Sequence, residues 1–495
     1  MSDEPRREDA APTAPAVPAA TPVDLSAATR IHVVGIGGAG MSAIASVLAA
    51  MGHRVSGSDL KESPGLDRLR ALGIRVEVGH AAAHIGDAQL VTVSTAIPQT
   101  NVEIAAARAR GLPVLRRAEI LAALARTRRS IAVAGTHGKT TTSSMLALAL
   151  VEAGLRPSFI IGGDVNEIGS GAVWDSGELF VIEADESDGT FLEIGAEAVV
   201  VTNIEPDHLD HYGGFANLEA AFDRFVRAAS GARVLCADDA NTRALIDRLR
   251  TDGIELVSYG TADDADVRIV DIVRQPQRTQ ARLVRRGVDL GVVELPVPGL
   301  HNLRNATAAL TVALEMGATF EASRRALGRF GGVARRFEQR GEIAGVTFVD
   351  DYAHLATEVR AALEAARFGG YRRVVCVFQP HRYSRTRSLW QSFTDAFVDA
   401  DLLVVTDVYA SNERPIPGIT GKLVVNAVLD EHPWARVAYL PFRRDVVRYL
   451  VDELRAGDLC LTLGAGDLTL LPDELQPLLA AKHASRVPAP ATVAS

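Results

Sequence analysis

The stretch SIAVAGTHGKTTTSSMLALALVEAG, residues 130–154, carries the features that decide the fold of this chain. Its apolar start, residues 130–134, predicts a buried strand, and the apolar periodicity of residues 145–154 predicts a helix. The glycine-rich segment GTHGKTTT, residues 135–142, joins the two. A glycine-rich turn between a strand and a helix points backbone N–H groups at a phosphate, and the positive end of the helix adds to the attraction. The stretch therefore predicts a phosphate-binding loop in a mostly parallel α/β domain.

Lys139 and Thr140 follow the last glycine of this loop, and Lys139 is conspicuous because the chain otherwise contains only Lys61, Lys422 and Lys482. In loops of this kind the lysine reaches the outer phosphates and the hydroxyl ligates Mg²⁺. The spacing is tighter than in the common GxxxxGK[ST] pattern, because Gly135 lies three residues before Gly138. A helix-capping turn with an unrelated lysine is the alternative interpretation.

The composition is that of an ordinary globular protein, with 495 residues, 47% hydrophobic and 23% charged. At roughly 100–200 residues per domain, about two to four domains are expected. The net charge of −9 argues against general nucleic-acid binding. The three cysteines, Cys236, Cys376 and Cys460, lie far apart, so neither a disulfide framework nor a structural zinc site is predicted. No apolar run reaches the roughly 18–20 residues that span a bilayer, so we expect a cytoplasmic protein without a membrane segment.

The pattern of strand, glycine-rich turn and helix begins three times along the chain. The first occurrence begins with RIHVVGIGGAG (30–40), the second is the stretch at residues 130–154, and the third begins with VTFVDDYAH (346–354). The predicted fold class is therefore α/β with three domains. We place these domains at residues 29–128, 129–333 and 334–482, with Ala/Pro-rich disordered tails at residues 1–28 and 483–495. An antiparallel pair of strands is expected at the edge of the central domain, at residues 266–274 and 280–297.

The segment GIGGAGM (35–41) matches the GxGxxG pattern through Gly35, Gly37 and Gly40. After a first strand, such glycines let a diphosphate approach the backbone. Asp59, at the end of the next predicted strand, can bind a ribose hydroxyl or serve only as a turn residue. Because the motif fits a UDP-sugar as well as NAD, it predicts a diphosphate site without identifying the nucleotide.

Two polar segments follow later predicted strands of the central domain. VIEADESDGTF (181–191) and the residues just after it supply five carboxylates, from Glu183, Asp185, Glu186, Asp188 and Glu193. TNIEPDHLDHYG (202–213) supplies Asp207, His208, Asp210 and His211. Carboxylates at a strand end beside a phosphate loop suit a hard cation, so at least one of the five should ligate a metal ion. Histidine with carboxylates also binds divalent ions, although such a cluster is often a capping network.

The predicted C-terminal domain carries DDYAH (350–354), QPHRYSRTR (379–387) and GAGD (464–467). The second segment contains three arginines, Arg382, Arg385 and Arg387, directly after a predicted strand. Arginine binds carboxylate or phosphate groups in a bidentate manner. The alternative is a solvated basic loop.

Taken together, these motifs resemble those of the Mur ligase family, over about residues 29–475. The resemblance rests on GTHGKTTT, EADESD, TNIEPDHLD, HNLRNA, RRFEQRG, DDYAH, FQPHRYSRTR, DVYA and LGAGD, which occur in the family's order. It is nearest to the members that join L-alanine to UDP-N-acetylmuramate. It implies a Rossmann-like N-terminal domain for the UDP-sugar, a P-loop-type central ATPase domain and a Rossmann-like C-terminal domain for the amino acid.

In this family, ATP phosphorylates the muramoyl carboxylate to an acyl phosphate, which the amine of the amino acid then attacks. The resemblance therefore implies ATP, Mg²⁺ with two ions, and a role in cytoplasmic peptidoglycan-precursor synthesis. It also turns GIGGAGM from a hint of NAD into a UDP-diphosphate site. The sequence leaves open whether the protein is a monomer or a homodimer.

The resemblance also implies roles for individual residues. The implied catalytic residues are Lys139, Glu183, His208, His354, Arg382 and Arg385. The implied ATP-binding residues are Gly135, Thr136, His137, Gly138, Lys139, Thr140, Thr141, His301, Asn302, Asn305 and Arg336. The implied UDP-sugar-binding residues are Gly35, Gly37, Gly38, Gly40, Met41, Ser58 and Asp59. The implied amino-acid-binding residues are Asp351, His354, Arg382 and Arg385, and the implied metal ligands are Thr140, Glu183 and His208.

The sequence departs from the family pattern at two places. Leu355 and Ala356 replace the second histidine and the proline of DDYAHHPTE, and Asn412 replaces a glycine in YAAGE. These changes bear on the amino-acid site and on the geometry of a nearby loop. The chain also has no lysine between Lys139 and Lys422. It therefore cannot supply the carbamylated lysine that several sister ligases use to hold their second metal ion.

Three alternatives to the L-alanine ligase stay open. A related ligase attaches a whole tripeptide to the same sugar nucleotide, but GIGGAGM and Tyr352 favour the alanine enzyme. An NAD-dependent oxidoreductase would use GIGGAG and Asp59 and would leave GTHGKT unexplained. A catalytically dead homologue would require that Leu355 and Ala356 disable the chemistry.

Overall fold

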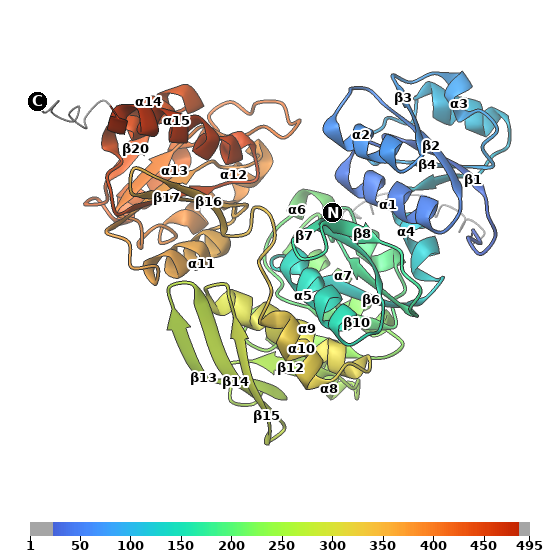
Figure 1. Ribbon diagram of the computed structural model, residues 1–495, viewed down its shortest axis with the longest axis horizontal. Coiled ribbons are helices and arrows are strands. Elements are labelled where there is room, and N and C mark those ends of the chain that lie inside the picture. The colour runs from blue at the N-terminus through green and yellow to red at the C-terminus, as the bar shows by residue number, and fades with distance from the viewer. Residues whose placement is uncertain (1–22, 485–495) are drawn as a thin grey trace, which may run out of the picture.

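Three sheets, one in each of three α/β lobes, organise the computed structural model, which describes residues 23–484 (Figure 1). The N-terminal and central lobes lie next to each other, and the C-terminal lobe lies on the other side of the central lobe (Figure 1). This arrangement confirms the predicted α/β class with three domains and mostly parallel sheets.

The N-terminal sheet is parallel, with the strand order β3-β2-β1-β4-β5. Its elements are β1 (Arg30–Val34), α1 (Ala39–Ala50), β2 (Arg54–Asp59), α2 (Pro64–Ala71), β3 (Arg75–Val78), η1 (Ala82–Ile85), β4 (Leu90–Val93), α3 (Val102–Ala109), β5 (Val114–Arg116) and α4 (Arg117–Ala125). The order reverses between β1 and β4, which is where doubly wound sheets bind ligands. The segment GIGGAGM follows β1 directly, so it lies at this position.

The central sheet has ten strands in the order β15-β14-β13-β12-β11-β10-β6-β9-β7-β8. Its first half comprises β6 (Arg129–Ala134), α5 (Lys139–Glu152), β7 (Ser158–Val165), β8 (Ser170–Val173), β9 (Leu179–Glu183), η2 (Thr190–Glu193), β10 (Ala198–Val201), α6 (Leu209–Tyr212) and α7 (Phe215–Ala228). Its second half comprises β11 (Arg233–Cys236), α8 (Ala240–Thr251), β12 (Val257–Gly260), β13 (Val267–Gln275), β14 (Arg278–Arg285), β15 (Val288–Leu295), α9 (Leu300–Glu315) and α10 (Phe320–Leu327).

The predicted antiparallel pair at the edge of this sheet is a three-stranded meander. Residues 266–274 correspond to β13, as expected, but residues 280–297 form two strands, β14 and β15, instead of one. The chain reverses at Arg286 and Gly287, which have φ angles of 47° and 85°. Glycine adopts such positive φ values without steric cost, which permits a tight hairpin turn here.

The C-terminal sheet has the order β16-β17-β21-β18-β19-β20, in which only β16 is antiparallel. Its elements are β16 (Glu338–Ile343), β17 (Val346–Asp351), α11 (Ala356–Arg367), β18 (Arg373–Phe378), α12 (Tyr383–Leu389), η3 (Trp390–Phe393), β19 (Leu402–Val405), α13 (Lys422–Glu431), β20 (Val437–Tyr439), α14 (Arg443–Glu453), β21 (Asp458–Leu463), η4 (Asp467–Leu470) and α15 (Leu471–Ala484). Helix α11 faces the central lobe (Figure 1).

The ends of the structured chain differ slightly from the prediction. Leu25, which the sequence analysis assigned to the first tail, is buried in the core that also contains Ile31 and Leu48. At the other end, α15 continues to Ala484, two residues into the predicted second tail. Residues 1–22 and 485–495 of these tails lie outside the described residues. Within residues 23–484, none of the helices combines the length and the apolar character needed to cross a membrane.

Helix α5 fixes the position of the glycine loop. Every residue from Thr140 to Leu150 is buried, because α5 packs against the sheet on one side and against α9 and α10 on the other. A helix that is buried all round cannot shift without disturbing the core. The loop that precedes it is therefore held in a fixed place at the carboxyl edge of the central sheet.

Candidate active site

The glycine loop has a backbone that requires its glycines. Gly135 and Gly138 have φ angles of 135° and 78°. A Cβ atom on Gly135 would collide with the Thr202 hydroxyl, and one on Gly138 would lie 2.5 Å from Asn305 Oδ1. The sequence GTHGKT can therefore form this turn where bulkier residues cannot.

Lys139, the first residue of α5, lies in an acidic environment. Its Nζ donates to Glu186 Oε1 at 2.9 Å and to the Gly135 carbonyl at 2.6 Å. Burial lowers the pKa of the ammonium group, but attraction by Glu186 and Asp185 outweighs burial and raises it. Burial also raises the pKa of Glu186 to about 7, against the attraction of Lys139. The lysine therefore stays charged at the mouth of the loop.

Thr140 and Glu183 form a site of hard oxygen donors. Thr140 Oγ1 donates to Glu183 Oε1 at 2.9 Å, and the Gly162 N–H donates to Glu183 Oε2 at 2.6 Å. Within residues 23–484, no group of three or more His, Cys, Asp and Glu side chains is arranged to hold a metal ion. Hydroxyl and carboxylate oxygens nevertheless fit Mg²⁺, which usually takes one or two carboxylates and completes its shell with phosphate and water oxygens. His208, the third predicted ligand, lies with Nε2 3.3 Å from Asp207 Oδ2.

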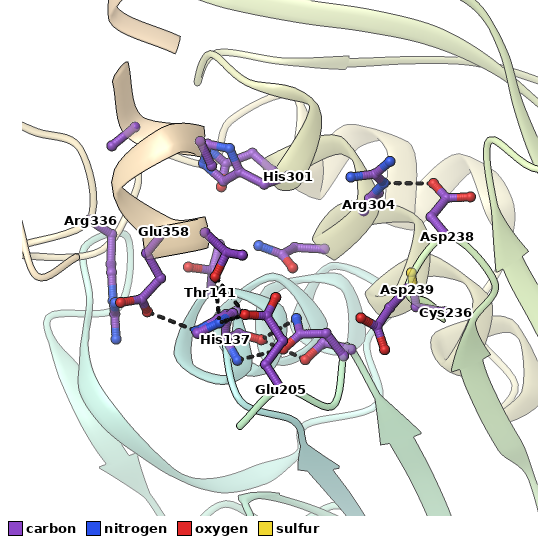
Figure 2. Close-up of a pocket in the computed structure, with 18 of the residues that line it drawn as sticks. His137, Thr141, Glu205, Cys236, Asp238, Asp239, His301, Arg304, Arg336 and Glu358 are labelled. Atoms are coloured by element: carbon purple, nitrogen blue, oxygen red, sulfur yellow. Dashed lines mark hydrogen bonds and ion pairs between the residues drawn. The ribbon is translucent and has the colours of Figure 1, made fainter. Parts of the chain in front are cut away.

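One side of the loop borders a cavity of about 330 Å³ (Figure 2). The predicted ATP-binding residues that line it are His137, Gly138, Thr141, His301, Asn302, Asn305 and Arg336. Gly135, Thr136, Lys139 and Thr140 do not line it. The C-terminal lobe contributes Thr357 and Glu358 from α11, so this cavity is completed by two domains. At its far end, Arg304 Nε donates to Asp238 Oδ2 at 2.6 Å.

The other side of the loop region borders a second cavity of about 650 Å³, between the N-terminal and central lobes. Gly37 and Gly40 line it from one lobe, and Glu183 and Asp185 line it from the other. Arg117, which sequence analysis missed, also lines this cavity. Its buried Nε has no hydrogen-bond partner among the described residues and lies 3.1 Å from the position of a Cβ on Gly40. A partly buried guanidinium with a free Nε–H beside a glycine loop is suited to binding an anion.

The remaining predicted UDP-sugar residues are placed differently. Gly35, Gly38, Met41, Ser58 and Asp59 do not line the second cavity. Asp59 Oδ2 accepts the Gly37 N–H at 2.8 Å, so this carboxylate supports the loop. Ser58 is fully buried and donates its hydroxyl to Glu103 Oε2 at 2.5 Å. In this structure Ser58 therefore stabilises the strand end, and the prediction that it contacts the sugar nucleotide is not supported by its position.

Arg385 connects the C-terminal lobe to the central lobe. Its Nε and Nη2 donate to the two carboxylate oxygens of Asp207 at 3.0 and 3.1 Å, and its Nη1 contacts His381 Nδ1 at 2.8 Å. Burial raises the pKa of Asp207, but attraction by Arg385 outweighs it and lowers the pKa to about 2. The neighbouring Arg382 keeps a buried Nε without a hydrogen-bond partner among the described residues. Arg387 is exposed.

Asp351 and His354 lie beside this contact. The Asp351 carboxylate accepts the N–H groups of Phe337 and Ala353, both at 2.7 Å, and burial raises its pKa to about 6. His354 is packed against the ring of His381, with ring centroids 5.7 Å apart. Burial lowers the pKa of His354 to about 4, so the imidazole is neutral near pH 7.

The departures from the family pattern are accommodated by the structure. Leu355 is buried and its N–H donates to Glu358 Oε2 at 3.1 Å, while α11 begins normally at Ala356. Asn412 has a φ of 71°, in the left-handed region. Asparagine tolerates this region better than most residues, so it can replace a glycine there. Neither change disrupts the backbone at the site.

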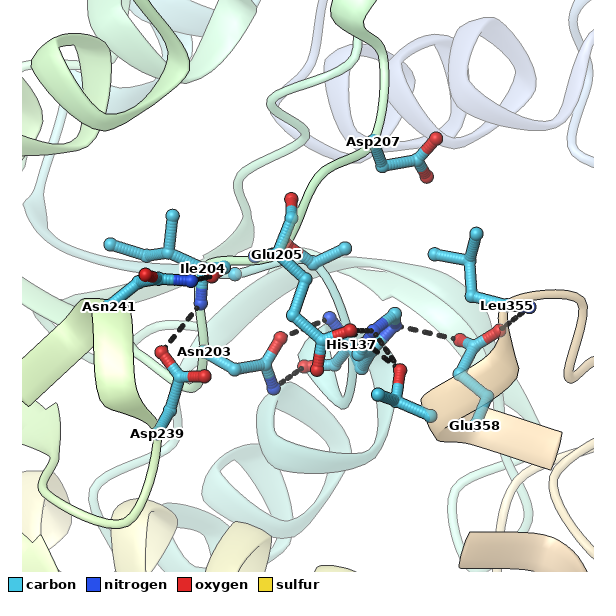
Figure 3. A network of polar contacts seen from close by, with 12 residues as sticks. His137, Asn203, Ile204, Glu205, Asp207, Asp239, Asn241, Leu355 and Glu358 are labelled. Atoms are coloured by element: carbon cyan, nitrogen blue, oxygen red, sulfur yellow. Dashed lines mark hydrogen bonds and ion pairs between the residues drawn. The ribbon is translucent and has the colours of Figure 1, made fainter. Parts of the chain in front are cut away.

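The side chain of His137 lies between two carboxylates (Figure 3). Its Nδ1 is 3.0 Å from Glu358 Oε1, and its Nε2 is 3.1 Å from Glu205 Oε2. Glu205 and Glu358, like Arg117, were not identified from the sequence. Glu205 stands within the motif TNIEPDHLD, and Glu358 stands four residues after His354. Motif position was the only signal that could have pointed to them, because their partners are far away in the chain.

Acidic and histidine residues that the sequence grouped together have separate positions. Lys139 pairs with Glu186, whereas Glu193 pairs with Arg116 of the N-terminal lobe at 3.1 Å. Asp210 and His211 are exposed. Only some residues of each motif therefore lie at the glycine loop. The others are exposed to solvent or, like Glu193, form an ion pair between the lobes.

The fold and the site define a nucleotide-binding enzyme with two cavities flanking a phosphate loop. The family description "Mur ligase family, catalytic domain" matches residues 30–129, "Mur ligase middle domain" matches residues 133–313, and "Mur ligase, glutamate ligase domain" matches residues 335–466. The chain belongs to the Mur ligase family.

Relatives of known name are similar over nearly the whole chain. The UDP-N-acetylmuramate–L-alanine ligase of Kineococcus radiotolerans is 50% identical, covering 91% of this chain and 96% of the relative. That of Pelotomaculum thermopropionicum is 46% identical, covering 89% and 95%. The crystal structure of the UDP-N-acetylmuramate-alanine ligase MurC from Thermotoga maritima matches with a TM-score of 0.75 and 28% identity, covering 92% of this chain and 100% of that chain. The murein peptide ligase from Psychrobacter arcticus, at a TM-score of 0.66 and 24% identity, shares the fold.

The charge on His137 leads to a prediction about stability and pH. Burial lowers the pKa of the imidazole, but Glu358 and Glu205 outweigh burial and raise it to about 10. A histidine in an unfolded chain titrates near about pH 6.5. The stabilisation is therefore complete below that pH and is lost as the pH rises toward 10. His137→Asn should lower the melting temperature most near about pH 6 and progressively less above it, measured by calorimetry.

The control for this prediction is His211→Asn, which changes an exposed histidine of the same domain. It should leave the melting temperature nearly unchanged at every pH. A destabilisation by His137→Asn that is the same at low and high pH would contradict the assigned charge state.

Proposed function

We propose that this chain is an ATP-dependent ligase that joins the amino group of L-alanine to the carboxylate of UDP-N-acetylmuramate. This reaction is the first amino-acid addition in cytoplasmic peptidoglycan-precursor synthesis. The names of the relatives support the choice of substrates, since this chain covers 95% or more of their length. The observation that carries the proposal is the phosphate loop between two cavities, because a ligase of this kind must bring a nucleotide and a second anionic substrate to one point.

The first step brings two anions together, which requires positive charge. In the proposed complex the sugar nucleotide occupies the 650 Å³ cavity, where Arg117 binds its diphosphate or carboxylate. ATP occupies the 330 Å³ cavity, with its γ-phosphate near Lys139. Lys139 stabilises the phosphoryl group as it moves to the carboxylate.

Mg²⁺ would be held by Thr140 and Glu183, where it neutralises phosphate charge. We place a second ion beside His208, whose pKa is lowered by burial so that the imidazole is a neutral ligand. The carboxylates Asp185 and Asp207 lie in the same region and add to the attraction for cations, because both interact electrostatically with His208.

The second step takes place where the C-terminal lobe meets the central lobe. Arg385, Arg382, His354 and Asp351 surround the end of that lobe, and we assign them to the amino acid and the reacting carbonyl. Arg385 is oriented by its contact with Asp207, which leaves its other N–H donors for a carboxylate. The amine of L-alanine attacks the acyl carbon of the acyl phosphate, and the amide C–N bond forms. The C–O bond to the phosphate then breaks, so the phosphate leaves with the oxygen that bridged the acyl carbon and the phosphorus.

The proposal is tested by phosphate release from ATP with Mg²⁺. Release should require UDP-N-acetylmuramate and L-alanine together. Release with the sugar nucleotide and a tripeptide, but not with L-alanine, would move the chain to the tripeptide-ligating alternative. Failure to release phosphate with any substrate would contradict the proposal and favour a catalytically dead homologue or an NAD-dependent oxidoreductase.

Lys139→Ala should abolish turnover and leave UDP-N-acetylmuramate binding within about threefold. The reason is that Lys139 stabilises the transferred phosphoryl group but does not line the sugar-nucleotide cavity. Phosphate release and calorimetric binding measure the two effects separately. Lys422→Ala, which changes an exposed lysine of α13, is the control and should be fully active. Loss of sugar-nucleotide binding in Lys139→Ala would show that the cavities are wrongly assigned.

Arg117→Ala should raise the KM for UDP-N-acetylmuramate by about 10- to 100-fold, because a hydrogen bond to a charged group contributes about 1.5–3 kcal/mol. The KM for ATP should change little. Arg116→Ala is the matched control, since the adjacent arginine is exposed and pairs with Glu193 instead. Equal effects of the two substitutions on the KM for UDP-N-acetylmuramate would show that Arg117 does not bind this substrate.

A further inference from the structure

The backbone of His137 is fully engaged within the central domain. Its N–H donates to Asn203 Oδ1 at 2.8 Å. Its carbonyl accepts the Thr202 hydroxyl at 2.5 Å and the Asn203 Nδ2 at 3.1 Å. These residues directly follow β10, so this peptide of the glycine loop is tied to the strand end. In this arrangement the His137 N–H is not free to bind a phosphate.

The side chain of His137 instead reaches the C-terminal domain (Figure 3). Nδ1 contacts Glu358 of α11 at 3.0 Å, and Nε2 lies 3.1 Å from the Thr357 hydroxyl of the same helix. Thr357 Oγ1 also donates to Glu205 Oε2 at 2.6 Å. The imidazole therefore sits at the centre of a network that joins the glycine loop, the segment after β10 and the start of α11.

The same Glu358 carboxylate also binds the backbone at the start of its own helix, α11. Its second oxygen, Oε2, accepts the N–H groups of His354 and Leu355 at 2.8 and 3.1 Å. One carboxylate thus holds the first turn of α11, the segment that carries His354, and the glycine loop. A shift of α11 away from the loop would break all of these contacts around a single buried group.

Charge makes the contact specific for the docked arrangement. Only 14% of the His137 side-chain surface and 11% of that of Glu358 are exposed. Glu205 and Glu358 are both anionic at neutral pH, because their pKa values are lowered despite burial. Without a cation between them they would repel each other. The imidazolium of His137 removes this repulsion and lets α11 approach.

We propose that His137 is a positioning residue, which latches α11 of the C-terminal domain onto the glycine loop through Glu358, and not a phosphate ligand. The latch completes the 330 Å³ cavity, since Thr357 and Glu358 form part of its wall. The role of this latch rests on the proposed function, in which the C-terminal domain brings the amino acid to the acyl phosphate. Because His137 belongs to the glycine loop, the docking of α11 depends directly on the position of the loop that would bind the phosphates.

A second contact of α11 provides a matched control. Glu364, two turns further along the helix, pairs with Arg274 of β13 at 2.5 Å. This ion pair joins the same helix to the same domain, but it does not touch the glycine loop. If docking of α11 were all that mattered, loss of either contact would have a similar effect.

The test compares His137→Asn, Glu358→Gln, the double variant and Glu364→Gln with the wild type. Each latch variant should lower kcat by about 10-fold or more. The kcat of the double variant should be about equal to that of the less active single variant, because the effects of residues that act as one unit are not additive. The Kd of a non-hydrolysable ATP analogue should rise less than the kcat falls. With the analogue bound, the radius of gyration from X-ray scattering should be larger in the latch variants. Glu364→Gln should resemble the wild type in all three measurements.

A conservative substitution guards against misfolding. His137→Asn keeps an amide donor near the position of Nδ1, which faces Glu358, without the charge, whereas His137→Ala removes the donor as well, so His137→Asn should retain more kcat than His137→Ala. Additive effects of His137→Asn and Glu358→Gln would overturn the latch. So would a loss of ATP-analogue affinity at an unchanged radius of gyration, which would identify His137 as a phosphate ligand.

Failure of the latch can be told apart from failure of the proposed function. Scattering and analogue binding need neither UDP-N-acetylmuramate nor L-alanine. If the wild type does not turn over with these substrates, the proposed reaction fails and the two physical measurements still decide the role of His137.

Discussion

The turn between β6 and α5 is the constraint on which the rest of the site depends. Its glycines have positive φ angles and leave no room for a Cβ atom, and the helix after it is buried on every side. The loop is therefore anchored by the packing of this helix, and the three domains are arranged around it. Arg117 and the first glycine motif approach from the N-terminal domain, and α11 approaches from the C-terminal domain.

Electrostatics explain why so many charges meet at this point. Glu183, Asp185 and Glu186 surround a single lysine, so the site carries an excess of negative charge before any substrate binds. A nucleotide triphosphate and a substrate carboxylate add to this excess. In the proposed reaction, catalysis therefore depends on cations, which Lys139 and Arg117 would supply and which Mg²⁺ at Thr140 and Glu183 would supplement. The acidic residues are useful because they hold these cations in place.

The sequence predicted the fold class and most of the elements of the three domains. Local patterns are sufficient for this purpose, since a glycine-rich turn between an apolar run and a helix looks the same in isolation as in the fold. The segment 280–297 was the exception, because its hairpin depends on a single turn at Gly287. The tail boundary also differed at Leu25, whose burial comes from packing against residues far along the chain.

The site was only partly predictable, for a related reason. Motifs placed Lys139, Glu183 and Thr140 together, because each stands at the end of a neighbouring strand or the start of the next helix. Which polar group each side chain contacts depends on tertiary packing. Ser58 binds Glu103 within the N-terminal domain, and His137 binds Glu358 across two domains. Neither partner could be found from spacing in the sequence.

In the proposed reaction, ATP phosphorylates the carboxylate of UDP-N-acetylmuramate, which is then joined to L-alanine. The most direct measurement uses UDP-N-acetylmuramate labelled with oxygen-18 in that carboxylate, together with ATP, Mg²⁺ and L-alanine. We expect the phosphate released during amide formation to carry a labelled oxygen, because the acyl phosphate takes one oxygen from the carboxylate. Release of unlabelled phosphate alone would contradict the proposed reaction, since the phosphate would then come from hydrolysis of ATP by water.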